Sequence, residues 1–143
     1  MSRLIAVPVL AALAALVPAS AASAAPTTFR GTTSQDAPLT LTIDGTRVTY
    51  RLTVVAECDG EEVRVPVRGT TRLTAKRDFL AEGQVTIEGA DDKATFQVGG
   101  SAARPTATTR TGTVELTGAG CDRVQSTWRA RKAPAKPKPK SKA

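Results

Sequence analysis

Hydrophobic and polar residues alternate along most of the chain after residue 25, and short turn signals separate the alternating runs. Leu39, Leu41 and Ile43 alternate with threonines, and a longer run of the same kind covers residues 48–56. A period of two is typical of β-strands that bury one face. No window shows a helical period. The pattern therefore predicts an all-β fold.

Turn residues between the runs predict antiparallel hairpins. Asp44-Gly45 separates the first two runs, and Asp59-Gly60 separates the second from a valine-rich run over residues 63–67. Asp-Gly is a strong hairpin signal because glycine readily adopts the positive φ of a tight turn. Pro66 lies inside the valine-rich run, and since proline cannot donate to a ladder we expect that strand at a sheet edge. A third hairpin is predicted around Gly89–Asp92.

The last alternating run, residues 124–131, places Val124, Ser126, Trp128 and Ala130 on one face. We expect Trp128 in the core; the alternative is an exposed ring that stacks on a sugar. The whole chain shows about eight short strands at close spacing. The sequence therefore predicts an antiparallel β-sandwich or small barrel formed by residues 25–131.

Residues 1–24 have the pattern of a secretory signal peptide. An apolar run from Leu4 to Val17 follows Arg3, and small residues continue to the cleavage motif Ala22-Ser23-Ala24. An uncleaved membrane anchor is the alternative, because the apolar segment approaches the roughly 20 residues that span a bilayer. Pro18 and the serines that follow it favour cleavage. We expect a secreted or envelope-associated protein.

The chain has two cysteines, Cys58 and Cys121. Cysteines of an exported protein usually pair, because the compartment is oxidising. The disulfide would close a loop of about 64 residues and stabilise the fold by about 4 kcal/mol on the chain-entropy model. Its geometry requires the two Cα atoms to lie roughly 4.4–6.8 Å apart. The alternatives are a redox pair or a metal site, which the wide spacing and the absence of histidine disfavour.

The net charge of +7 is concentrated near the C-terminus. Residues 25–128 hold 12 Lys and Arg against 13 Asp and Glu, whereas residues 129–143 hold seven basic residues and no acid. From residue 132 the chain contains only Lys, Ala, Pro and Ser, which predicts a disordered tail over 132–143. Flexible cationic chains bind polyanions through counterion release. We therefore expect polyanion binding to depend almost wholly on seven residues: Arg129, Arg131, Lys132, Lys136, Lys138, Lys140 and Lys142.

Candidates for catalysis and metal binding are few. Histidine is absent, which removes the commonest general base and the commonest metal ligand. Acids at 57–62 and 91–92 offer carboxylates, but solvated turns explain both sets. Hydroxyls and an amide at residues 31–35 could line a binding surface, or belong to an edge strand that enters a turn. No catalytic residue, metal or cofactor is predicted.

Five short motifs, which together span residues 29–131, carry a resemblance. They read Phe29-Arg30-Gly31-Thr32-Thr33-Ser34-Gln35, Cys58-Asp59-Gly60, Gly112-Thr113-Val114, Cys121 and Trp128-Arg129-Ala130-Arg131. In this pattern the chain resembles a group of small secreted bacterial proteins of uncharacterised function. The resemblance implies a compact β-domain with no assigned activity, and the basic extension is not part of it.

Two classes of function follow as hypotheses. The first is a non-enzymatic binding or structural β-domain whose basic tail associates with anionic wall polymer, lipid headgroups or other polyanions. The second is a secreted enzyme or enzyme inhibitor that acts through surface loops such as residues 101–109. For the tail alone, a solubility segment or a spacer without a partner is the alternative.

Overall fold

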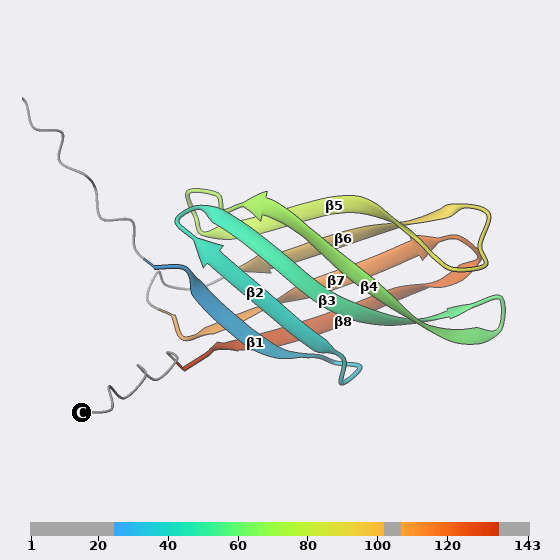
Figure 1. Cartoon of the computed structure of the whole chain (residues 1–143), viewed down its shortest axis with the longest axis horizontal. Coiled ribbons are helices and arrows are strands. Elements are labelled where there is room, and N and C mark those ends of the chain that lie inside the picture. Colours follow the sequence, from blue (N-terminus) through green and yellow to red (C-terminus); the bar gives the residue numbers. More distant parts are fainter. Residues whose placement is uncertain (1–24, 102–106, 135–143) are drawn as a thin grey trace, which may run out of the picture.

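The computed structural model describes residues 25–101 and 107–134, which form eight β-strands (Figure 1). Among these residues no helix is long and apolar enough to cross a membrane. The predicted signal peptide and residues 135–143 of the predicted tail lie outside the described residues. The all-β prediction is confirmed. The strands are β1 (Thr27–Thr33), β2 (Pro38–Asp44), β3 (Arg47–Cys58), β4 (Glu61–Arg72), β5 (Asp78–Thr86), β6 (Lys93–Ser101), β7 (Thr109–Gly118) and β8 (Cys121–Lys132).

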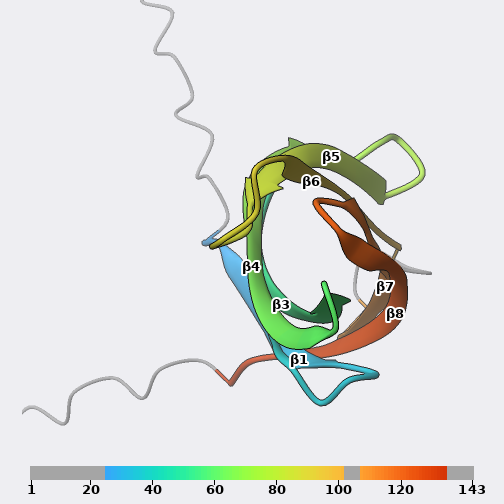
Figure 2. The same ribbon diagram turned by 90° about the vertical axis from the view of Figure 1, so that its right-hand side faces the viewer.

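The strands form one antiparallel sheet in the order β4-β3-β2-β1-β8-β7-β6-β5. The sheet curls into a small barrel, which Figure 2 shows end-on. Of the two predicted architectures, the barrel is the one observed. Strand pairing is interrupted between β4 and β5, because no backbone ladder joins them in the described part of the chain. A side-chain hydrogen bond crosses the gap instead: the Thr71 hydroxyl donates to the Leu80 carbonyl at 3.3 Å. We call this boundary the β4–β5 seam. Pro66 lies on β4, so its predicted edge position is confirmed.

Tight turns set the register of the hairpins, as the sequence predicts. In the β3–β4 turn, Asp59 and Gly60 have φ values of 50° and 82°, two successive positive values of the kind that a type I′ turn needs. Strands β2 and β3 turn at Asp44-Gly45, and β5 pairs with β6 around the third predicted turn. All three predicted hairpins are therefore present.

Cys58 and Cys121 are joined by a disulfide, as predicted. The β1–β2 hairpin turns back before it reaches them, so β3 and β8 pair directly at these two residues. Their Cα atoms lie 3.8 Å apart, below the expected range and below the roughly 4.5 Å usual for residues opposite each other on antiparallel strands. The disulfide ties the β3–β4 hairpin to the β7–β8 hairpin at one end of the barrel.

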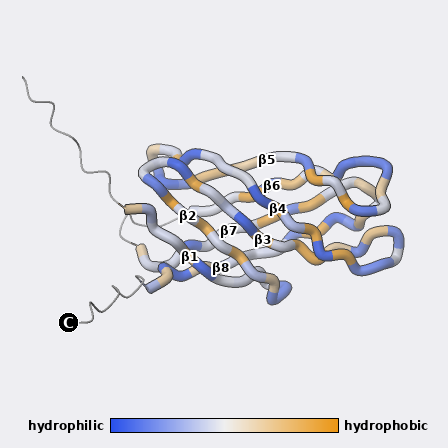
Figure 3. Tube along the Cα trace, viewed as in Figure 1, coloured by the Kyte–Doolittle hydropathy of each residue, from blue (hydrophilic) through white to orange (hydrophobic). Residues whose placement is uncertain are grey.

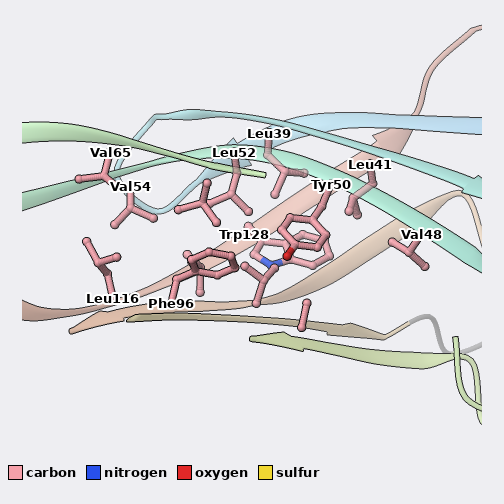
Figure 4. Close-up of a cluster of buried hydrophobic side chains, with 14 of the residues drawn as sticks. Leu39, Leu41, Val48, Tyr50, Leu52, Val54, Val65, Phe96, Leu116 and Trp128 are labelled. Carbon is pink, nitrogen blue, oxygen red and sulfur yellow. The ribbon is translucent and has the colours of Figure 1, made fainter. Parts of the chain in front are cut away.

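Three large aromatic rings fill the interior, and each lies over a glycine directly opposite it on a neighbouring strand. A Cβ atom at any of these glycines would come within 3.0 Å of the ring, closer than real Cβ atoms approach. A barrel of eight strands leaves only enough room inside for side chains, so glycine makes the space that each ring occupies. Figure 4 shows the three rings together in the core. The pairs are Tyr50 with Gly69, Phe96 with Gly83, and Trp128 with Gly112.

Trp128 is 2 % exposed and stacks on Phe79, with ring centroids 6.2 Å apart and an interplanar angle of 24°. Its indole N–H donates to the Thr113 carbonyl at 3.3 Å. The predicted core position is confirmed. The alternative of an exposed sugar-stacking ring is wrong, because the inward face of β8 points into the packed interior.

Candidate functional site

The acidic residues gather at one end of the barrel, where the β3–β4, β5–β6 and β7–β8 turns meet (Figure 1). We call it the hairpin end. The β3–β4 and β5–β6 turns contain strongly hydrophilic residues in Figure 3, whereas the strands alternate. The acids that the sequence singled out are exposed here, and the described residues contain no cluster of three or more metal-ligating side chains. Eight of the 13 acids lie at this end: Glu57, Asp59, Glu61, Glu62, Glu88, Asp91, Asp92 and Asp122.

Exposed arginines of β8, β1, β3 and β4 share the outer face of the sheet, with β2 between β1 and β3. We call the outer face of these five strands the arginine face. Since adjacent strands lie about 4.8 Å apart, a row of residues in register across these five strands is about 19 Å long. Four of the five residues in one such row are exposed arginines, and no acid interrupts it. The row runs Arg131, Arg30, Thr40, Arg51 and Arg68.

Arginines on this face stand directly opposite one another in three cross-strand pairs. Like charges in this position destabilise a sheet. The one salt bridge among the described residues joins Arg123 to Glu115 at 3.1 Å, so no carboxylate forms an ion pair with these arginines. Asp44 on β2 stands opposite Arg47, and the other two pairs have no acid opposite them. A surface that binds anions gains from such an arrangement, because the ligand supplies the missing charge. The pairs are Arg30–Arg131, Arg51–Arg68 and Arg47–Arg72.

The row of arginines ends at a groove along the β4–β5 seam. The groove has a volume of about 590 Å³. Its lining includes Arg51 and Arg68 on one side of the seam, and Gln84 and Thr86 on the other. Volumes of this order are typical of ligand-binding clefts. The sheet therefore offers a recessed path for a ligand next to an exposed arginine pair.

Three of the seven residues predicted to form a polyanion-binding tail belong to the sheet. Arg129 and Arg131 lie on the outer face of β8, and Lys132 is the last residue of that strand, opposite Phe29. The Lys132 amide donates to the Thr108 carbonyl at 2.7 Å. β8 thus extends one residue into the segment predicted as the tail. The remaining four residues of the set, Lys136, Lys138, Lys140 and Lys142, lie outside the described residues.

The polar groups at residues 31–35 serve the fold. The Gln35 side chain acts as a substitute strand partner: its amide nitrogen donates to the Val55 carbonyl at 2.6 Å, and its oxygen accepts from the Val55 amide at 3.0 Å. The hydroxyls of Ser34 and Ser126 are 2.8 Å apart. β1 lies between β2 and β8, so this strand is not at an edge. These contacts hold the β1–β2 turn against β3 and β8.

No protein-family model matches the chain, and neither the curated proteins nor the solved structures contain a match to it. The case for a function therefore depends on the surface of this chain alone. Its distinguishing feature is an uneven distribution of charge. Residues 25–128 are nearly neutral in sum, yet eight of the 13 acids lie at the hairpin end and the row of arginines contains none. Summing charge along the sequence hides this uneven distribution.

Proposed function

We propose that the protein is a secreted or envelope-associated, non-enzymatic binding module that associates with anionic polymers or anionic surfaces outside the cell membrane. The arginine face makes the contact together with the predicted tail, residues 132–143, which we call the basic C-terminal segment. The observation that carries the proposal is the row of exposed arginines, with its two opposed pairs, that no carboxylate neutralises.

Arginine suits this role because its planar guanidinium donates two parallel hydrogen bonds to a phosphate or carboxylate group. Adjacent arginines at about the strand spacing allow one anionic group to contact two of them. An acidic hairpin end repels the same ligand, so a polyanion meets the barrel on the arginine face rather than at random. The groove along the β4–β5 seam gives a flexible polymer a place to continue beyond Arg68.

The basic C-terminal segment starts beside the arginine face. Arg131 is opposite Arg30, and the Ala133 amide donates to the Thr28 carbonyl at 2.8 Å, so the chain leaves the sheet next to β1. A tethered second set of cations raises avidity because its binding to the same polymer becomes intramolecular. The disulfide supports an oxidising location, such as the outside of the cell.

Retention on immobilised long-chain polyphosphate tests the proposal. The variant Arg51→Gln/Arg68→Gln removes one opposed pair of the face. Lys76→Gln/Lys93→Gln removes two exposed cations outside the face, neither of them in a salt bridge among the described residues, and serves as the control of equal charge. We expect the first variant to elute at clearly lower salt than the parent, and the control to elute with the parent. Equal losses in both variants would show that only net charge matters. No loss in the first would remove the arginine face from the account.

A further inference from the structure

A single arginine is buried inside the barrel at the end opposite the hairpin end. Arg110 on β7 is 2 % exposed, and its guanidinium carbon lies 5.3 Å from the centre of the Phe29 ring. The guanidinium–ring contact is a favourable cation–π arrangement. It leaves hydrogen bonds unmade, however: the buried Nε and Nη1 atoms of Arg110 have no partner among the described residues.

Two further cations share the small cavity that Arg110 faces. Arg77, in the turn between β4 and β5, and Lys132, at the end of β8, line it together with Phe29 and Ile43. The Nε atom of Arg77 is also buried without a hydrogen-bond partner in the described part of the chain. Three donor nitrogens of two arginines are thus buried, with no hydrogen-bond partner among residues 25–101 and 107–134, around one cavity of about 110 Å³.

No side chain of the protein supplies the counter-charge. All 13 Asp and Glu residues lie between residues 36 and 122 and within the described ranges, and none of them forms an ion pair with Arg77 or Arg110. A buried charge without a partner is strongly unfavourable. Burial, and then the positive charge of Arg77, lower the pKa of Arg110. An arginine nevertheless stays protonated in proteins, so a bound anion would supply the charge that no Asp or Glu side chain provides.

The size of the cavity limits what that anion is. The cavity is small, about 110 Å³, and open on one side, so a compact ion fits within it and a larger ligand would have to extend out of it. Guanidinium groups match the oxygen geometry of tetrahedral oxyanions in a bidentate manner. Lys132 also lines a larger hollow of about 540 Å³ beside Arg30, where the remainder of a bigger ligand has room.

We propose that this cavity, the Arg110 pocket, binds one compact oxyanion of the phosphate type, either as a free ion or as the terminal monoester group of a larger ligand. The pocket lies inside the barrel, whereas the arginine face lies outside it. The proposal therefore does not depend on polyanion binding at the face, and each of the two proposals can fail without the other.

Titration of the full chain with inorganic phosphate, followed by NMR of the arginine Nε–H groups and by calorimetry, tests the pocket. We expect saturable binding of one ion, with the Nε–H resonances of Arg110 and Arg77 shifting most. Arg110→Met keeps an apolar stem of similar length and removes the guanidinium, and should weaken binding about tenfold or more, as loss of charge-assisted hydrogen bonds implies. Lys93→Gln, near the hairpin end and outside both proposed sites, removes one exposed positive charge and should bind phosphate like the parent.

Several results would overturn the pocket: no saturable binding, resonance shifts spread evenly over the exposed arginines, or equal weakening in Arg110→Met and Lys93→Gln. The titration of the parent needs no substitution, and Arg77→Gln is a second variant if Arg110→Met does not fold. A parallel titration with glycerol phosphate separates the two sources of the anion. Tighter binding of the monoester supports a larger ligand, and equal or weaker binding supports the free ion.

Discussion

Trp128→Ala should remove the most important single packing element of the core. The ring is 2 % exposed, stacks on Phe79, and covers both Gly112 and Gly100, which have no side chains of their own to fill the space. Substituting a buried aromatic by alanine costs about 3–5 kcal/mol, and the cost rises with the cavity that remains. Because glycines lie beneath the ring, little can collapse into the gap, and we expect about 4–5 kcal/mol.

A loss of this size is a large fraction of the total stability of a small domain, about 5–15 kcal/mol. Urea unfolding followed by far-ultraviolet circular dichroism measures it; tryptophan fluorescence does not serve, because Trp128 is the only tryptophan of the chain. Leu80→Ala is the control, since this apolar side chain is 59 % exposed and its loss should change the free energy of unfolding by less than about 0.5 kcal/mol. An unchanged urea midpoint in Trp128→Ala would refute the packing argument.

Three further predictions concern the same interior. Gly83→Ala should destabilise the fold by about 1–3 kcal/mol through overpacking, because the added Cβ atom would clash with the Phe96 ring. Thermal unfolding measures this effect, and a melting temperature equal to the parent's would contradict it. Burial raises the pKa of Tyr50 above 10.0. Folding therefore favours the protonated phenol. The titration of Tyr50 should leave the free energy of unfolding unchanged below about pH 10 and lower it above that pH. Phenolate absorbance reports this residue alone, since the chain has one tyrosine, and a pKa at or below 10.0 would be evidence against its burial. Reduction of the Cys58–Cys121 disulfide should cost about 4 kcal/mol in urea unfolding, and equal midpoints with and without reductant would remove its role in stability.

Much of this fold follows from local sequence. Alternation predicts which residues of β3 and β8 face inward, and the Asp-Gly turns predict their hairpins. A two-residue turn at Asp59-Gly60 also fixes the pairing of every residue in the β3–β4 hairpin. Counting outward from that turn places Arg51 opposite Arg68 and Tyr50 opposite Gly69. Both the charged pair and the ring–glycine pair can therefore be predicted from the sequence.

Other parts of the site cannot be predicted from local sequence, because they combine segments that are distant in the chain. Arg30 and Arg131 meet only because β1 lies beside β8 in the closed sheet, and no turn connects those two strands. The Arg110 pocket combines β7, the β4–β5 turn and the end of β8. For Arg110 one local signal existed: it shares the inward parity of Val114 and Leu116 on the same strand.

The salt dependence of binding to a single-stranded oligothymidylate, used as a linear phosphate polymer of defined length, tests the role of the arginine face most directly. Each phosphate contact contributes about −0.7 to the slope of log K against log salt concentration on a single strand. With the basic C-terminal segment present in both proteins, Arg30→Gln/Arg51→Gln/Arg68→Gln should reduce the magnitude of the slope by about 2 relative to the parent. An equal slope and an equal affinity for the two proteins would contradict a role for the arginine face, and would attribute binding to the C-terminal lysines alone.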